Sequence, residues 1–364
     1  MNIRQWVRPE VLEMAGYQPG EQPSMQRPLV KLNTNENPFS PPEPVLRAIA
    51  QADLQQLRLY PEPSSRPVRE AAAAAFGLEA EQVLVGNGSD DLLTILLRTF
   101  VAPGEWVAVP TPTYSLYHSL TQIQGGRFLA VPWRAGGELP VEELLAGQPK
   151  LVLVARPNAP TGHAVSLASV AELCRQSTGV VVLDEAYVDF ADDTGLPLLP
   201  QRANLILIRT FSKSMALAGL RIGLAFGGRE LLEQMHKVRD SYNVNRLSQL
   251  AAVAALNHRA AYQPILEGIR QQRQRLTDAL RQRGFQVPDS QANFVLARVP
   301  DGAWGGRQWF TALREAGILV RYFGDDPALV DHLRITIGRP GEMTALFEQL
   351  DRLLAGREMH TPQP

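Results

Sequence analysis

The chain has 364 residues, of which 45% are hydrophobic and 20% are charged, and this composition is typical of a globular protein of about two domains. Its formal net charge is −1 without a strong cluster of either sign, which argues against nucleic acid or an acidic membrane surface as the main partner. A single cysteine, Cys174, excludes an internal disulfide framework and a cysteine-based zinc site.

Roughly the first 40 residues are rich in proline, asparagine and glutamate and predict an arm rather than a domain. From about residue 80 to 226, short β-branched runs alternate with segments of helical period. The runs are continuously apolar, as in parallel strands that are buried on both faces. The alternation indicates an α/β fold with crossover helices. The expected strands are 82–86, 106–110, 151–155, 180–185, 205–209 and 222–226, and the helices between them include 89–99, 114–123 and 166–176.

The pattern changes near residue 228, where helical segments follow one another. A long helix over roughly 259–283 ends at Gly284, as a C-cap would. Shorter strands at 293–299, 317–321 and 332–337 then alternate with helices at 305–316 and 341–355, and they predict a second, smaller α/β domain. We therefore divide the chain into an arm (1–40), a large domain (41–258) and a small domain (259–364).

Lys213 comes just after the expected strand 205–209, in the stretch RTFSKSMALAGLRIG. Open α/β sheets bind ligands beyond the carboxyl ends of their strands, which is where this lysine lies. A lysine in a loop is usually a solvated surface residue. The stretch VVVLDEAY lowers that expectation, because it places Asp184 and Tyr187 at the end of the preceding strand. There a carboxylate can pair with a protonated ring nitrogen, and a phenol can bond to a ring oxygen.

An anion site is indicated by VGNGSDD (85–91), a glycine turn that opens a helix. The backbone N–H groups of Ser89 and Asp90 would point at the anion from the helix N-terminus. Ser212 and Arg221 can add donors to a phosphate, and Tyr114 in PTPTYSLY can stack on a flat ring. The glycine turn is neither a dinucleotide fingerprint nor a P-loop, because the spacing of both motifs fails here. An amine, an acid, a phenol, a stacking ring and a phosphate site together predict pyridoxal 5'-phosphate as the cofactor.

With these motifs in this order, the chain resembles the class I and II aminotransferases of the type I pyridoxal-phosphate fold. The lysine and DEAY segments are shared by many aminotransferases, whereas NENPFSPP, YPEP and SYNVNRLSQ indicate the histidinol-phosphate group or its near relatives. The resemblance implies a large domain with a mostly parallel, seven-stranded sheet, a smaller α/β domain, and an arm that packs on the small domain and on a partner subunit. The motifs that carry the resemblance are LNTNENPFSPP (32–42), RLYPEP (58–63), GNGSDD, PTYSLY, RPNAPTG (156–162), DEAYVDF (184–190), RTFSKSMALAGLRIG (209–223), DSYNVNRLSQ (240–249) and LRITIG (333–338).

The resemblance also implies roles for single residues. Lys213 would form the Schiff base and carry the proton, and the positive surroundings with partial burial should lower its pKa. Asp184 would pair with the pyridinium and Tyr187 with the ring oxygen. Tyr60 resembles a tyrosine that reaches the phosphate of the neighbouring subunit, which implies a homodimer with a shared active site. The phosphate would be held by Ser89, Asp90, Ser212 and Arg221.

One position departs from the pattern of the family. Many relatives carry Asn-Asn-Pro-Thr-Gly, and the second asparagine contacts the ring oxygen, but here that position is Ala159. Either Asn158 supplies the amide or Tyr187 serves the oxygen alone, and we expect Asn158 to do so. Asp91 stands where glutamate is frequent, which is a smaller change.

On the substrate side, Arg321 and Arg334 end two expected strands of the small domain and resemble substrate-binding positions. Paired arginines suit the phosphate of histidinol phosphate, and Arg334 would also hold the carboxylate of glutamate or 2-oxoglutarate. Tyr17 and Asn35 are further candidates for substrate contact. The implied reaction is transamination between glutamate and imidazole acetol phosphate in histidine biosynthesis. An aromatic-amino-acid aminotransferase and a threonine-phosphate decarboxylase of the same fold remain alternatives.

The expected partners are small molecules and a second copy of the chain, without nucleic acid, membrane or metal. The sequence has no run of about 18 apolar residues, and its N-terminal segment lacks the apolar region of a signal peptide. We therefore expect a cytoplasmic protein.

Overall fold

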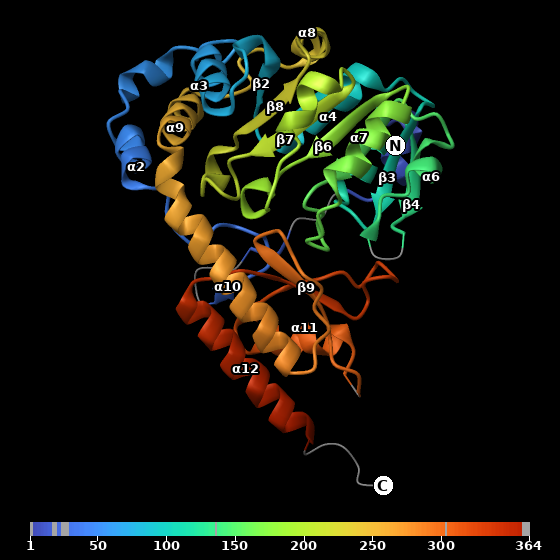
Figure 1. Cartoon of the computed structure of the whole chain (residues 1–364), viewed down its shortest axis with the longest axis vertical. Helices are drawn as coiled ribbons and strands as arrows, with labels where there is room; N and C mark the ends of the chain where they lie inside the picture. Colours follow the sequence, from blue (N-terminus) through green and yellow to red (C-terminus); the bar gives the residue numbers. More distant parts are fainter. Residues whose placement is uncertain (1–2, 17–19, 23–28, 135–136, 303, 359–364) are drawn as a thin grey trace.

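The computed structural model describes residues 3–16, 20–22, 29–134, 137–302 and 304–358. Its large domain is built on a twisted sheet whose strand order, in the described part of the chain, is β2-β8-β7-β6-β5-β3-β4 (Figure 1). β8 runs antiparallel to both of its neighbours, and the other pairings are parallel. This confirms the predicted mostly parallel α/β sheet. The strands are β2 (Val83–Gly86), β3 (Trp106–Thr111), β4 (Arg127–Pro132), β5 (Leu151–Ala155), β6 (Val180–Asp184), β7 (Leu205–Thr210) and β8 (Gly223–Gly227).

Both faces of this sheet are buried, for the reason that the continuous apolar runs suggested. In β5, Leu151 and Leu153 pack on one side while Val152 and Val154 pack on the other, because side chains alternate along a strand. One face is covered by α4 (Ser89–Phe100) and α8 (Arg229–Val238), whose buried leucines belong to the same core as Leu151. β4 was missing from the sequence prediction although residues 128–131 are apolar, and it is an edge strand with mostly exposed or half-buried residues.

The small domain carries a three-stranded antiparallel sheet in the order β11-β12-β9 (Figure 1). Its strands are β11 (Arg321–Tyr322), β12 (His332–Thr336) and β9 (Phe294–Arg298). The expected strand 317–321 is divided: β10 (Ile318–Leu319) pairs instead with β1 (Val30–Lys31) from the N-terminal part of the chain. The chain therefore passes from the small domain into the large one directly after β1, through residues 32–37.

Helices complete both domains, and the longest, α10 (Gln263–Gln282), runs from the large domain into the small one in Figure 1. Among the described residues, no helix has the length and apolar character needed to cross a bilayer. The remaining helices are α1 (Pro9–Glu13), α2 (Glu43–Ala50), α3 (Arg66–Phe76), α5 (Leu116–Gln124), α6 (Val141–Leu145), α7 (Leu167–Gln176), α9 (Arg246–Asn257), α11 (Gly306–Glu315) and α12 (Pro340–Glu358), with short 3-10 turns at Ile3–Gln5, Leu54–Arg58, Ala80–Gln82, Val188–Phe190, Leu196–Gln201, Ala218–Leu220 and Arg259–Tyr262.

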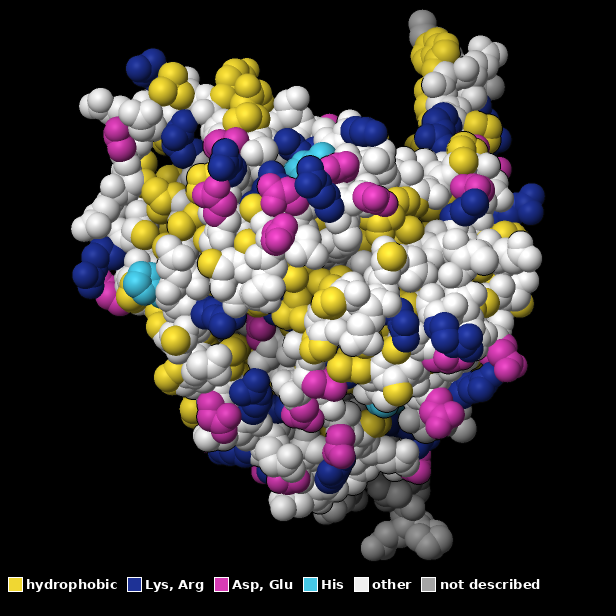
Figure 2. All heavy atoms as spheres, turned by 45° about the horizontal axis from the view of Figure 1, so that its top comes forward, with side chains coloured by type: hydrophobic (Ala, Val, Ile, Leu, Met, Phe, Trp, Pro, Cys, Tyr) yellow, Lys and Arg dark blue, Asp and Glu magenta, His cyan; other side chains and the backbone are white. Residues whose placement is uncertain are grey.

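The surface has no single dominant charge on the face that Figure 2 shows. Basic and acidic side chains are interspersed there with apolar ones. This distribution agrees with the net charge of −1.

Candidate active site

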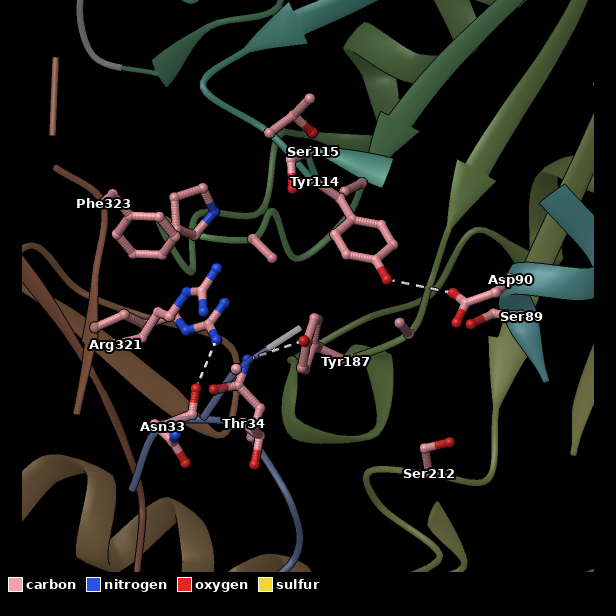
Figure 3. A pocket seen from close by; sticks show the side chains of 18 of the residues that line it. Asn33, Thr34, Ser89, Asp90, Tyr114, Ser115, Tyr187, Ser212, Arg321 and Phe323 are labelled. Carbon is pink, nitrogen blue, oxygen red and sulfur yellow. Dashed lines mark hydrogen bonds between the residues drawn. The ribbon is translucent and has the colours of Figure 1, made fainter. Parts of the chain in front are cut away.

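A cavity of about 870 Å³ lies where the carboxyl ends of the large-domain strands meet the small domain and the N-terminal segment (Figure 3). It brings together residues that are far apart in the sequence. Within the described chain, no group of three or more histidine, cysteine or acidic residues is placed to hold a metal ion. The cavity is lined by these residues from the sequence prediction: Asn35, Ser89, Asp90, Tyr114, Asp184, Tyr187, Ser212, Lys213, Arg221, Arg321 and Arg334.

Lys213 is carried on the loop that leaves β7, the fully buried strand that ends at Thr210. Its Nζ atom donates a hydrogen bond of 3.0 Å to the carbonyl oxygen of Thr34 and lies 5.9 Å from the centre of the Tyr187 ring. Removal of the amine from bulk water lowers the pKa of Lys213 to about 8, and the positive charge of Arg334 contributes in the same direction. A lysine of this pKa is partly neutral near pH 7–8, so it can act as a nucleophile and as a base.

Asp184 is the last residue of β6 and is buried. Its Oδ2 atom accepts a 2.7 Å hydrogen bond from the hydroxyl of Tyr117, and Oδ1 accepts one of 3.1 Å from the backbone N–H of Ala186. Burial raises the pKa of Asp184 to about 6, and the bond from Tyr117 opposes that rise. A buried carboxylate in this position is stabilised by a cation beside it, as a protonated ring nitrogen would be.

Tyr117 was not singled out in the sequence, although it stands in the PTPTYSLY motif. Its side chain is fully buried, and its ring meets that of Tyr114 edge-on at 5.6 Å. The sequence did contain a signal for Tyr117, because Tyr114 and Tyr117 are three residues apart and residues with this spacing in a helix lie on the same face. Because Tyr114 was expected to face the cofactor, Tyr117 could have been placed beneath it, next to the acid at the end of β6.

Tyr187 is held by residues that belong to the other side of the cavity. Its hydroxyl oxygen accepts a 2.9 Å bond from the side-chain amide of Asn35, and its ring meets Phe294 edge-on at 5.0 Å. Asn35 is fixed in turn, because Thr336 bonds both to its backbone N–H and to its side-chain oxygen, each at 3.0 Å. Burial raises the pKa of Tyr187, which keeps the phenol protonated and able to donate to a ring oxygen.

An anion cradle forms where α4 begins. The first N–H groups of a helix have no partner within the helix, so those of Ser89 and Asp90 are open to an anion. Arg221 donates to the hydroxyl oxygen of Ser212 at 3.1 Å and pairs with the Asp90 carboxylate at 3.2 Å. The backbones also approach closely: a Cβ on Gly223 would lie 2.6 Å from the Gly88 carbonyl carbon, so only glycine fits there.

The residues present therefore fit pyridoxal 5'-phosphate on grounds that are independent of the sequence resemblance. The cradle at α4 suits the phosphate, the buried Asp184 suits a protonated ring nitrogen, and the Tyr187 phenol suits the ring oxygen. Lys213 reaches the space between these groups.

The structure differs from the expectation at Asn158. This residue is buried, and it is not among the residues that line the cavity. Its amide ties its own loop to the segment that follows β3, because Nδ2 donates to Pro112 and Thr161 while Oδ1 accepts from Thr113. Ala159 lines the cavity instead. The replacement of an amide by a methyl group at this position therefore leaves Tyr187 as the nearby donor for a ring oxygen.

Tyr60, which was also expected at the site, lies elsewhere. It is outside the cavity lining, has 77% of its surface exposed, and stacks on Tyr242 with ring centres 4.5 Å apart. Tyr17 lies outside the described residues, although Gly16 and Gly20 on either side of it line the cavity.

Arg321 lies on the small-domain side, across the cavity from Ser212 and Asp90 in Figure 3, and Arg334 lines the same cavity. They are direct partners across β11 and β12, so both side chains leave the same face of the sheet. Arg334 donates to the carbonyl oxygen of Asn33 at 3.0 Å. Two guanidinium groups at one wall of a cavity form a site for an anion that can accept from both.

Comparisons with known proteins agree with this geometry. Residues 27–350 match the family model for aminotransferase class I and II. The chain is 45% identical to the histidinol-phosphate aminotransferase of Synechocystis sp., over 94% of this chain and 96% of the relative. It is 42% identical to histidinol-phosphate aminotransferase 1 of Nostoc sp., over 97% and 99%. The crystal structure of histidinol-phosphate aminotransferase from Sinorhizobium meliloti in complex with pyridoxal-5'-phosphate matches with a TM-score of 0.84 at 28% identity, covering 90% of this chain and 91% of that one.

Proposed function

Because the chain belongs to the class I and II aminotransferases, we propose that it transfers an amino group between glutamate and imidazole acetol phosphate, which gives 2-oxoglutarate and histidinol phosphate in histidine biosynthesis. The observation that carries the substrate assignment is the cross-strand pair Arg321 and Arg334, in a cavity that also holds Lys213 and Asp184. One guanidinium group can form two parallel hydrogen bonds with a carboxylate, whereas a phosphate has enough oxygen atoms to accept from two guanidinium groups.

Pyridoxal 5'-phosphate is the cofactor, and when bound it supplies an electron sink for the charge that develops at the substrate Cα. We assign its covalent attachment to Lys213 and the binding of its phosphate to Ser89, Asp90, Ser212 and Arg221. Asp184 faces the ring nitrogen in this assignment, and Tyr187 faces the ring oxygen. Tyr114 completes the ring site from the side of α5.

Lys213 has two tasks in this scheme. As a neutral amine it would hold the cofactor through its aldehyde carbon, with loss of water, and once displaced by the amino substrate it would accept the proton from Cα. Its pKa of about 8 supports both tasks, because a lysine with an ordinary pKa would be almost fully protonated near neutral pH. Asp184 stays ionised while it faces a cation, and Tyr117 holds its carboxylate in place through a 2.7 Å hydrogen bond.

We assign Arg334 to the carboxylate of glutamate and 2-oxoglutarate, and the pair with Arg321 to the phosphate of histidinol phosphate. Asn35 is assigned to the substrate as well, but its side-chain amide also donates a hydrogen bond to Tyr187 and so helps to hold that phenol in place. Tyr17 is assigned to the substrate on resemblance.

The active unit in this proposal is a homodimer in the cytoplasm, with small molecules as its other partners. Tyr60 and its exposed neighbours Leu54, Leu57 and Leu59 form an apolar area of the kind that a second subunit covers. Tyr60 would reach the cofactor phosphate of that subunit. Sedimentation of the holoenzyme as a monomer at micromolar concentration would contradict this part of the proposal.

We also retain the division into an arm (1–40), a large domain (41–258) and a small domain (259–364). Its support is that β1 pairs with β10 and that Glu21 pairs with Arg314 at 2.8 Å, both between the N-terminal segment and the small domain. Limited proteolysis that releases the segment before residue 41 without changing the two domains would agree with these boundaries.

The proposed reaction is tested by a panel of amino donors. We expect kcat/KM for histidinol phosphate to exceed the values for phenylalanine and threonine phosphate, with 2-oxoglutarate as the acceptor. Preference for phenylalanine would indicate an aromatic-amino-acid aminotransferase, and loss of carbon dioxide from threonine phosphate would indicate a decarboxylase.

A further inference from the structure

Phe323 has no role in the reaction as described above, yet it lies at the wall of the cavity that carries both arginines. It directly follows β11, and side chains alternate along a strand. Tyr322, which precedes it, stacks on Phe310 of α11, with ring centres 5.6 Å apart. Phe323 thus follows Arg321 on the side of the cavity, as Figure 3 shows.

The ring of Phe323 is shared by the two arginines. The guanidinium carbon of Arg321 lies 5.8 Å from the centre of this ring, and that of Arg334 lies 5.6 Å from it. Arg334 also lies 5.2 Å from the Phe294 ring and is bonded to Asn33. Arg334 therefore has several fixed neighbours besides Phe323, and Phe323 is a neighbour that the two guanidinium groups share.

Side-by-side guanidinium groups need such a partner. Like charges directly opposite on neighbouring strands repel each other, and Arg321 and Arg334 are such a pair. The face of an aromatic ring carries partial negative charge and attracts a guanidinium without satisfying its N–H donors. A ring can therefore hold both groups in place and leave their donors directed at a ligand.

We propose that Phe323 is a positioning residue that holds Arg321 and Arg334 together at the cavity wall and thereby favours a phosphate ligand over a carboxylate. A phosphate group carries nearly two negative charges and three acceptor oxygens, so it can bond to both forks at once. A carboxylate carries one charge and two oxygens, and the fork of Arg334 is sufficient for it. The inference rests on the proposed function for the identity of the natural substrate, but the preference for phosphate can be measured with simple anions.

The backbone supports the same reading, because Phe323 is fixed by local hydrogen bonds. Its carbonyl oxygen accepts from the N–H of Asp326 at 3.1 Å, and the carbonyl oxygen of Asp326 accepts from Leu329 at 2.9 Å. The loop between β11 and β12 is thereby folded into consecutive turns, and Leu329 is buried. A side chain on such a loop is held in one place, as a positioning role requires.

The test compares Phe323→Leu, which keeps an apolar side chain without the ring, with Phe323→Tyr, which keeps the ring. In each holoenzyme, inorganic phosphate is measured as a competitive inhibitor of the glutamate half-reaction, and single turnovers are recorded with glutamate and with histidinol phosphate. The melting temperature and the absorbance of bound cofactor report on folding and loading. Since the two variants differ in aromaticity at one site, a purely structural role for the side chain would not separate them in this way.

We expect Phe323→Leu to weaken the binding of phosphate and of histidinol phosphate by about 3- to 30-fold, the range of a partly desolvated cation–π contact. Its effect should appear in KM and not in the maximal rate, and glutamate should change by less than about threefold. Phe323→Tyr should stay within about threefold of the wild type for all three ligands. Equal losses in both variants, equal losses for phosphate and glutamate, or a wild type that phosphate does not inhibit would each overturn the inference.

Failure of the proposed function gives a different result. A wild type that is inert toward histidinol phosphate would sink the substrate assignment, whereas a selective loss of phosphate binding in Phe323→Leu would still support the role of Phe323.

Discussion

The hydroxyl of Tyr117 donates a 2.7 Å hydrogen bond to Asp184, and both side chains are buried between α5 and the end of β6. This bond favours the ionised carboxylate, whereas burial favours the neutral acid and raises the pKa of Asp184 to about 6. The pKa of Asp184 thus depends on a residue that does not itself line the cavity.

Tyr117→Phe should move the acidic limb of the kcat/KM profile to higher pH. Removing a hydrogen bond from a charged group costs about 1.5–3 kcal/mol, which corresponds to an upward shift of roughly one to two pKa units for Asp184. The measurement is kcat/KM for glutamate between pH 5 and pH 9, with Tyr114→Phe as the matched control. An unchanged acidic limb in Tyr117→Phe would show that Asp184 is held ionised by other groups.

Asp184→Asn should abolish most of the activity, because an amide cannot balance a protonated ring nitrogen, and it should stabilise the protein without cofactor. The pKa of Asp184 in the folded protein is about 6, above the value of 3.8 for a free aspartate. As the pH rises from 3.8 to about 6, this carboxyl group therefore lowers the free energy of unfolding. Above that interval, the variant should be more stable by up to about 3 kcal/mol. Urea denaturation of the wild type and the variant, each without cofactor, measures this difference in stability at pH 7 and at pH 4. If the variant is as much more stable at pH 4 as at pH 7, burial of an ionised Asp184 is not the cause.

Lys213 should react with added pyridoxal phosphate at a rate that rises with pH around a midpoint of about 8, because only the neutral amine attacks. Arg334→Ala should move the midpoint upward, since the charge of Arg334 lowers the pKa of Lys213. Glu36→Gln should move it downward, since the Glu36 carboxylate raises that pKa. Rapid-mixing absorbance with the apoenzyme gives these midpoints. Shifts of the same sign in both variants would rule out a direct electrostatic cause.

Borohydride should fix the cofactor on a peptide that contains Lys213. Modification of Lys150 or Lys237 in its place, as read by mass spectrometry, would refute the assignment. Lys213→Ala should lower turnover by about 10⁴-fold or more, because the attachment point and the base at Cα are lost together. Lys237→Ala is the control: this lysine lies on α8 and bonds to Gln234, outside the cavity.

Arg321→Ala should weaken the use of histidinol phosphate far more than the use of glutamate. A charge-assisted hydrogen bond contributes roughly 1.5–3 kcal/mol, so kcat/KM for histidinol phosphate should fall by about 10- to 150-fold. Glutamate keeps Arg334, which remains bonded to Asn33. The absorbance change of the cofactor follows each half-reaction separately. An equal fall in both half-reactions would place Arg321 outside the phosphate site.

Sequence patterns were sufficient for six of the seven described strands of the large sheet and for most of the charged and aromatic residues that were expected in the cavity. The buried strands β5, β6 and β7 are continuous apolar runs, and the ends of such strands are where an α/β sheet binds ligands. Lys213 and Asp184 follow from that rule, because each is placed by its own strand. β4 was missed although its residues 128–131 are apolar, and this short run lies at the edge of the sheet, where most of its residues are exposed or half-buried.

The sequence by itself determined which residue types gather at the ends of the strands, and the assigned roles follow from side-chain type and from position at the end of an element. It did not determine which of two neighbours points into the cavity. Asn158 was expected there and Ala159 lies there, because the loop uses the Asn158 amide to bond Pro112, Thr113 and Thr161.

Only the tertiary structure decided the contacts between segments that are distant in the sequence. Asn35 meets Tyr187, Arg321 meets Arg334 across two strands, and one ring, Phe323, touches both arginines. Local propensity carries no information about such pairs, because each depends on how the two domains and the segment between them close around the cavity. The physical reason is that charge and hydrogen bonding in the site act over a few ångströms in space, whereas sequence patterns report only on neighbours along the chain.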